Sequence, residues 1–169
     1  MDAVFLKRQL ALNRDRVAGL ARGIADDQAT WKPDDESWSI LEVICHLADE
    51  EEFDFPPRLR GILEEPNKPW PEIDPAGWVS ERNYIEADLF ETLSRYMNLR
   101  NEALAWLDTI DNPDWDAVHE APFGEITAGD LFVSWVGHDL LHLRQLVELQ
   151  RFYLVEQAKP YSVDYGGDW

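Results

Sequence analysis

The chain has 169 residues, 15 of them basic and 34 acidic, so its formal net charge at pH 7 is −19. The length suits one domain, and a hydrophobic fraction of 45% indicates a packed core rather than a disordered acidic tail. So few basic residues, diluted among so many acids, argue against binding to nucleic acid or to an anionic membrane surface.

Four segments show the apolar period of a helix, and none alternates like a strand. The first covers residues 2–24, with Asn13 in one position of an otherwise apolar stripe. The apolar positions of that stripe are Leu6, Leu10, Val17, Leu20 and Ile24. The second helix begins at Ser39, because Ser39 and Glu42 have the spacing of a capping box.

The prolines predict where the second helix stops. Pro56 and Pro57 are expected to kink or end it, with a further turn as far as Leu63. Residues 64–79 are expected to be irregular, because they contain four prolines. These are Pro66, Pro69, Pro71 and Pro75. A connection of this length can cross over an end of a bundle or lie across its side.

The third helix is predicted over residues 82–110, with Asp111-Asn112-Pro113 ending it. Its apolar face consists of Ile85, Leu89, Leu93, Tyr96, Leu104 and Leu107. The fourth helix begins with a second capping box, Thr127 to Asp130, and runs to about residue 157. The tail, residues 158–169, is predicted to be non-helical, and its aromatic side chains suggest that it packs on the helices.

The fold class that follows is all-α, with a single four-helix-bundle domain over residues 1–169. Its second and third helices are joined by a long crossover connection. A lone cysteine, Cys45, excludes an internal disulfide and fits a reducing compartment. The N-terminus does not resemble a signal peptide and no segment is apolar for long enough to span a membrane. A cytoplasmic protein is the expectation.

Two of the four histidines, His138 and His142, are spaced i, i+4 on the fourth predicted helix. They lie on the stripe that also contains Leu131, Trp135, Gln145, Leu146 and Leu149. Two imidazoles at this spacing can reach one divalent ion. The alternative is that both rings pack in the core with their nitrogens hydrogen-bonded.

His46, on the second helix, supplies a third imidazole if the two helices adjoin. Three protein ligands leave a coordination position for water or substrate, as in catalytic sites. The alternative for His46 is a surface position among acids. Asp49 and Glu50 can ligate the metal, orient a ligand or act as a base. The favoured alternative is that they belong to a solvated acidic run that ends at Glu52.

Arg100 falls at the centre of the apolar stripe of the third helix. A cation in this position either pairs with a carboxylate of a neighbouring helix, which is favoured, or holds an anionic substrate near the metal. His119 is expected in a loop, and Cys45 points away from His46. The remaining aromatic candidates are expected to pack in the core rather than to cage a ligand. They are Trp31, Trp38, Trp106, Trp115 and Trp135.

Two segments together resemble the motifs of the DinB/YfiT-like metalloenzyme superfamily. The segment from Glu36 to Asp49 reads ESWSILEVICHLAD, and the segment from Trp135 to Leu146 reads WVGHDLLHLRQL. The resemblance covers nearly the whole chain in helix order, histidine spacing and the long second connection. It implies a four-helix bundle, often a homodimer, that holds zinc, nickel or a similar divalent ion.

Residue by residue, the family's three-histidine site carries over to His46, His138 and His142, with no departure in that triad. Arg100 is the best match for a substrate-binding arginine. The resemblance favours transfer of a low-molecular-weight thiol to an electrophile, with Arg100 as a candidate catalytic residue. Glu50 is the second candidate, because it lies four residues after His46 on the same predicted helix. A metal-dependent hydrolase and a non-catalytic, stress-related metal-binding bundle are the alternatives. The expected partner is a small-molecule substrate.

Overall fold

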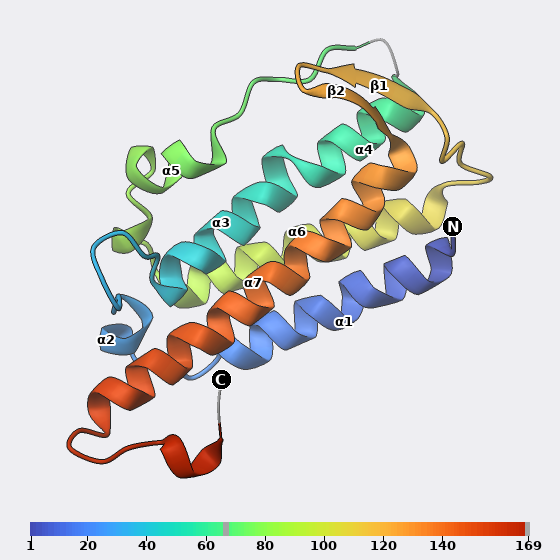
Figure 1. Ribbon diagram of the computed structural model, residues 1–169. Coiled ribbons are helices and arrows are strands. Elements are labelled where there is room, and N and C mark those ends of the chain that lie inside the picture. The colour runs from blue at the N-terminus through green and yellow to red at the C-terminus, as the bar shows by residue number, and fades with distance from the viewer. Residues whose placement is uncertain (66–67, 168–169) are drawn as a thin grey trace.

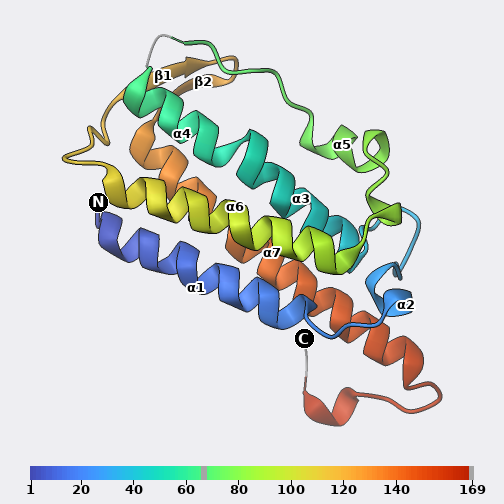
Figure 2. The same cartoon turned by 180° about the vertical axis from the view of Figure 1, so that it is seen from behind.

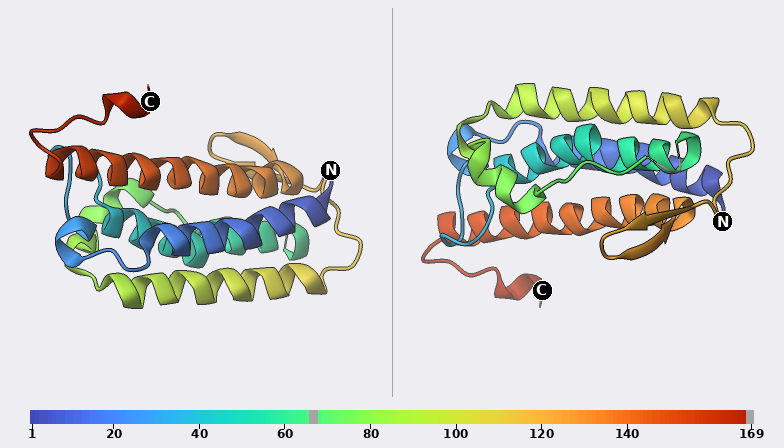
Figure 3. Two further views of the ribbon diagram at one scale, coloured as in Figure 1. Left: turned by 90° about the horizontal axis from the view of Figure 1, so that it is seen from below. Right: turned by 90° about the horizontal axis from the view of Figure 1, so that it is seen from above.

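The computed structural model describes residues 1–65 and 68–167. In this part of the chain, long helices form a bundle, which confirms the predicted all-α fold class (Figure 1). They are α1 (Ala3–Ala21), α3 (Ile40–Phe53) continued by α4 (Phe55–Glu64), α6 (Leu89–Thr109) and α7 (Ala128–Gln157). Helix α6 packs on α1 and α3, and α7 packs on α1, α3 and α4. Seen from below and from above, α1 and α3 lie between α7 and α6 (Figure 3).

The connection between α4 and α6 brings the chain back along the bundle. It passes over α3 and α4 and reaches α5 (Pro75–Glu81), which packs on α3 (Figure 1). As a result, α3 and α6 run in the same direction side by side, while α1 and α7 run in the opposite direction (Figures 1 and 3). Of the four prolines predicted to keep this connection irregular, Pro66 lies outside the described residues.

Helix α5 corrects the expectation that residues 64–79 are irregular. The carboxylate of Asp74 caps this helix by accepting a hydrogen bond from the Gly77 amide at 3.0 Å. Pro75 occupies the first helical position, where the missing N–H costs nothing and the fixed φ suits a helix. A proline that breaks a helix in its interior therefore begins one here.

The second predicted helix divides at the expected place. Helix α3 ends at Phe53, and α4 begins at Phe55, directly before Pro56 and Pro57. These two prolines lack the N–H groups that would continue the hydrogen-bond ladder. The first helix also ends slightly earlier than predicted, because Gly23 adopts a left-handed conformation with φ of 82°.

Four further elements differ from the sequence prediction. A short helix, α2 (Asp26–Ala29), follows α1, and a 3-10 turn, η1 (Tyr84–Glu86), takes the place of the first turn predicted for the third helix. Strands β1 (Val118–Ala121) and β2 (Gly124–Thr127) form an antiparallel hairpin where no strand was expected. Strand β1 reads VHEA and β2 reads GEIT, so neither shows the alternation of apolar and polar residues that indicates a strand.

The C-terminal tail is mostly non-helical, as predicted, with one 3-10 turn, η2 (Asp164–Gly166). The expectation that its aromatic residues pack on the bundle is wrong for Tyr161 and Tyr165, which are 81% and 106% exposed. Residues 168–169 of the predicted tail lie outside the described residues.

Helix α3 is the central element of the bundle. Every residue from Ile40 to Glu51 is buried, because α6, α7, α5, η1 and α2 surround the helix. The sequence predicts only an apolar stripe for this helix, so its polar face was expected to be solvated. Burial on all sides means that each polar residue of α3 needs a partner inside the protein.

Removing the capping box that begins α3 is expected to lower the free energy of unfolding by about 1 kcal/mol. The Ser39 hydroxyl accepts a hydrogen bond from the Glu42 amide, and the Glu42 carboxylate accepts one from the Ser39 amide at 2.7 Å. Ser39→Ala, measured by urea unfolding, tests this. Thr127→Ala removes the cap of α7 and is the matched control. If Ser39→Ala has the same free energy of unfolding as wild type, the Lys32–Glu42 ion pair is sufficient to fix the N-terminal end of α3.

In the described residues, helices that are long enough to cross a bilayer are too polar to do so.

Candidate metal centre

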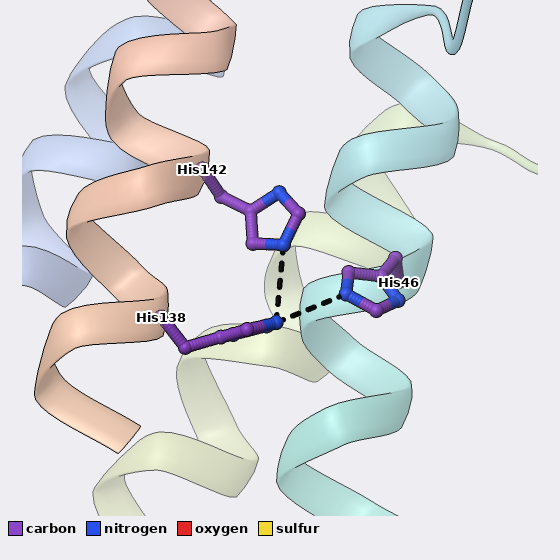
Figure 4. A group of neighbouring side chains, drawn as sticks. All are labelled: His46, His138 and His142. Carbon is purple, nitrogen blue, oxygen red and sulfur yellow. Dashed lines mark hydrogen bonds between the residues drawn. The ribbon is translucent and has the colours of Figure 1, made fainter. Parts of the chain in front are cut away.

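Three histidine side chains from two neighbouring helices meet on one side of α3. His138 and His142 are one turn apart on α7, and His46 projects from the facing side of α3 (Figure 4). The Nε2 atom of His138 lies 3.3 Å from Nε2 of His46 and 3.1 Å from Nε2 of His142. The structure thus brings together all three residues of the predicted triad.

The spacing of these nitrogens fits a bound divalent ion. Ligand atoms bound tetrahedrally to zinc at about 2.0–2.1 Å lie about 3.3 Å from one another. The three Nε2 lone pairs would be satisfied together by one cation held by His46, His138 and His142. His46, His138 and His142 form a cluster of potential metal-ligating atoms that lie within 4.8 Å of one another.

The protonation of the three rings suits metal ligation. Burial, with His142 nearby, lowers the pKa of His46 to about 3. Burial and the other two rings lower the pKa of His138 to about 3, and burial also lowers the pKa of His142. All three imidazoles are therefore neutral at pH 7, and a neutral imidazole is the form that binds a metal.

The Nδ1 atoms of His142 and His46 point away from the cluster and have different neighbours. Nδ1 of His142 donates to the Gln145 side-chain oxygen at 2.8 Å, which leaves Nε2 with its lone pair facing the cluster. Nδ1 of His46 faces a carboxyl oxygen of Glu50 at 3.7 Å, which is too long for a hydrogen bond. Glu50 therefore lies behind His46, on the side away from the three Nε2 atoms.

Aromatic side chains enclose the cluster. The Trp38 ring centroid is 5.0 Å from that of His46 and 6.4 Å from that of His142, to which it is nearly parallel. The Phe55 ring lies 5.1 Å from His138. The expectation that Trp38 serves only as core packing is incomplete. The sequence signal for it is its position directly before the Ser39 cap, on the same helix start that leads to His46.

The acidic run that follows His46 is not solvated, which corrects the favoured prediction for it. Asp49, Glu50 and Glu51 are buried, and in this run only Glu52 faces solvent. Asp49 accepts hydrogen bonds from Arg82 and Arg95, both at 2.6 Å, and from the Tyr84 hydroxyl. It is held on the α5 and α6 side of α3, away from the histidines.

Glu50 is expected to be protonated at pH 7. Burial, reinforced by the carboxyl of Asp54, raises the pKa of Glu50 to about 9. Asp54 in turn pairs with Arg58 at 2.9 Å. In this state Glu50 is a hydrogen-bond donor rather than a base.

Arg100 lies at the centre of a buried network that joins all four helical segments of the bundle. Its guanidinium donates to both carboxylate oxygens of Asp139 at 2.8 Å and to Glu51 at 2.6 Å. Asn13 donates to Asp139 at 3.2 Å, and the Trp135 indole donates to Glu51 at 2.7 Å. The favoured prediction, an ion pair with a neighbouring helix, is confirmed.

Asp139 and Glu51 were both missed by the sequence analysis. A signal for Asp139 exists, because it lies at the centre of the buried face formed by Phe132, Val136, Leu143 and Leu146. Asn13 and Arg100 occupy equivalent central positions on α1 and α6. One polar residue inside the apolar stripe of each of several helices indicates a shared buried network.

The remaining histidine is placed differently from the prediction. His119 is buried in β1 rather than in a loop, and its ring stacks on Trp70 at 4.2 Å. This contact fixes the hairpin against the connection that follows α4.

Cys45 is expected to resist thiol reagents in the folded protein. Its side chain is buried, its S–H faces the Tyr84 carbonyl at 3.8 Å, and burial raises its pKa to about 11. The reactive thiolate is therefore scarce at pH 8. A chromogenic disulfide reagent should react with one thiol per chain in urea and with almost none in buffer. Rapid reaction in buffer would show that the α3–η1 contact opens.

Two hollows flank the segment Glu36–Trp38 beside the cluster. One, of about 400 Å³, is lined by His142, Gln145 and Trp38, and the other, of about 440 Å³, lies on the α5 side. Figure 2 shows the bundle from behind, with α4 and α6 facing the viewer. A larger hollow of about 550 Å³ is lined by residues of α4, of α6 and of the connection that follows α4. It touches none of the three histidines, so its size does not make it the site of the chemistry.

The comparisons with known proteins agree with this architecture. Residues 9–146 match the model of the DinB superfamily. The fold is similar to that of YfiT from Bacillus subtilis, which is described as a probable metal-dependent hydrolase with an unusual four-helix bundle topology. The TM-score is 0.77 at 21% sequence identity, over 86% of this chain and 84% of YfiT. No curated protein matches the chain significantly. From the family match over most of its length, the chain belongs to the DinB superfamily.

Proposed function

We propose that the protein is a divalent-metal-dependent enzyme that acts on a small molecule, with His46, His138 and His142 as the metal ligands. The observation that carries this proposal is the convergence of three neutral imidazole nitrogens from two helices. Imidazole ligands suit zinc and nickel among the divalent ions. Three protein ligands leave a position open, which favours catalysis over a purely structural ion.

A divalent ion bound there would act as a Lewis acid and lower the pKa of a coordinated water or thiol. The side chains around it have supporting roles. Gln145 fixes the ring of His142 through its 2.8 Å hydrogen bond. Glu50, protonated behind His46, limits the rotation of that ring, so we assign it a positioning role. Trp38 and Phe55 keep water from the sides of the cluster.

Arg100 also acts by positioning in this proposal. Its partners Asp139 and Glu51 belong to the two helices that carry the histidines, and Asp139 directly follows His138. The network therefore fixes the register of α3 against α7. With both terminal nitrogens of its guanidinium already bonded to protein oxygens, Arg100 has little capacity to anchor a substrate.

We propose hydrolysis as the reaction, because an open position on such a site takes up water and because the structurally similar YfiT is described as a probable hydrolase. Transfer of a low-molecular-weight thiol, which the sequence motifs favour, is the second candidate. The same open position accepts a thiolate, and the hollow beside Trp38 offers room for a small molecule.

The test uses protein purified without a histidine-rich tag and loaded with zinc or nickel. One assay follows the hydrolysis of nitrophenyl esters. The other follows the transfer of glutathione or bacillithiol to a chloronitrobenzene, in which the thiolate displaces chloride. We expect turnover that needs the ion and disappears when His46, His138 and His142 are all changed to alanine. His119→Ala should retain it. Stoichiometric metal without turnover of either kind would favour the non-catalytic metal-binding alternative.

A further inference from the structure

We propose that the substrate of this site carries a positive charge on a compact, partly apolar body, such as an alkyl or aryl ammonium group. This inference rests on the proposed function, because it concerns the approach to the same three histidines. It is carried by the side chains that line the two hollows beside the cluster.

Both hollows share the segment Glu36–Trp38, and Trp38 contacts two of the three histidine rings. The first hollow is walled by His142 and Gln145 on α7, with Leu149 and Phe152 further along that helix. The second lies between this segment and α5. The first hollow reaches His142, so a molecule that approaches the cluster there passes the side chains of that hollow. The lining of the second hollow reaches Trp38 but none of the three histidines, so this hollow contributes the field of its charges only.

The charges in these walls are almost all negative. Carboxylates from four residues line the two hollows: Asp35, Glu36, Glu42 and Glu148. Lys32 is the one cation in either lining among the described residues, and it already pairs with Glu42 at 2.7 Å. Arg144 pairs with Glu148 from outside the lining. Glu36 and Asp35 have no such partner among the ion pairs of the described residues.

Aromatic faces lie among these carboxylates. The Trp38 and Phe152 rings both line the first hollow, and an ammonium group is attracted to the face of an aromatic ring. An anion would be repelled both by these carboxylates and by the faces of these aromatic rings. The net charge of −19 extends the same preference to long range, because it attracts cations towards the molecule and repels anions.

This preference bears on the two candidate reactions. A thiol with several free carboxylates would approach against the field of Glu36 and Glu148, whereas a cationic ester or amide would approach along it. The hollows therefore favour hydrolysis of a cationic substrate over transfer of an acidic thiol.

The experiment compares two probes of similar shape and opposite charge that have little tendency to bind a metal directly. These are benzyltrimethylammonium and benzenesulfonate, added to the zinc-loaded protein and followed by saturation-transfer NMR. We expect saturable binding of the cation, at least about fivefold tighter than that of the sulfonate, which corresponds to about 1 kcal/mol.

The variant Glu36→Gln/Glu148→Gln removes two carboxylates from the first hollow. It should bring the two affinities within about twofold of each other. The matched control is Glu120→Gln/Glu125→Gln, which changes the net charge equally but lies on the hairpin at the other end of the bundle (Figure 1). The control should leave the preference for the cation unchanged.

Equal binding of both probes, or tighter binding of the sulfonate, would overturn the inference, as would an equal effect of the control variant. Zinc content, measured on the same samples, separates this failure from that of the proposed function. A protein that binds no zinc contradicts the metal site itself, whereas a zinc-loaded protein that does not prefer the cation contradicts only the substrate class.

Discussion

Replacing His142 with alanine is expected to lower the affinity for zinc or nickel by more than about 100-fold. The reason is that the variant removes one of three converging Nε2 atoms, and even changes to residues that only orient a ligand cost about 10–100-fold in affinity. The measurement is competition with a chelating dye at pH 7, together with elemental analysis of the purified protein. Wild type should hold about one ion per chain.

Two control variants define what the His142 result means. Gln145→Ala keeps all three ligands but frees the His142 ring, so its affinity should fall by about 10–100-fold. His119→Ala removes a histidine that stacks on Trp70 far from the triad and should leave the affinity unchanged. Stoichiometric metal in His142→Ala would contradict the assignment of the triad.

Replacing Arg100 with methionine is expected to lower the free energy of unfolding by about 3–5 kcal/mol. The side chain is 1% exposed, and the variant would leave the carboxylates of Asp139 and Glu51 buried without their cation. Urea unfolding at pH 7 measures the loss. Because most domains have only about 5–15 kcal/mol of stability, a large part of the protein would unfold at modest urea concentrations.

The matched control for this variant is Arg95→Met on the same helix. Arg95 is 39% exposed, and its partner Asp49 keeps Arg82 and Tyr84, so the expected loss is about 1 kcal/mol or less. Adding Glu51→Gln and Asp139→Asn to Arg100→Met should recover part of the stability, because the stranded charges are then gone. Normal stability of Arg100→Met with lost turnover would instead support the anchoring of an anionic substrate.

The ends of the helices were predictable where local chemistry decides them. Ser39 and Thr127 begin α3 and α7 as predicted, because a capping box satisfies backbone groups within four residues. The same locality explains the break before Pro56. The prediction was wrong for α5, where the capping carboxylate of Asp74 turns Pro75 from a helix breaker into the first residue of a helix.

The helical period indicated the pair His138 and His142, and it offered His46 as a third ligand only if the two helices adjoin. Spacing of four residues places His138 and His142 on one face of α7, and His46 follows a well-marked helix start. The meeting of the three rings depends on α3 and α7 being neighbours, which is a property of the whole bundle. The motifs that resemble those of the DinB family implied that α3 and α7 are neighbours, and the family match agrees with this.

What the sequence determined by itself is therefore the long helices of the bundle, the capping boxes of α3 and α7 and the candidate ligands, because these depend on interactions within a few residues. Only the tertiary structure decided which polar residues are buried. Helix α3 is enclosed on all sides, so the run Asp49–Glu51, which has the composition of a solvated face, lies inside the protein. Its charges are balanced by arginines about 30 to 50 positions away in the chain, such as Arg82 and Arg100. Burial is set by every neighbouring element at once, and no local pattern contains that information.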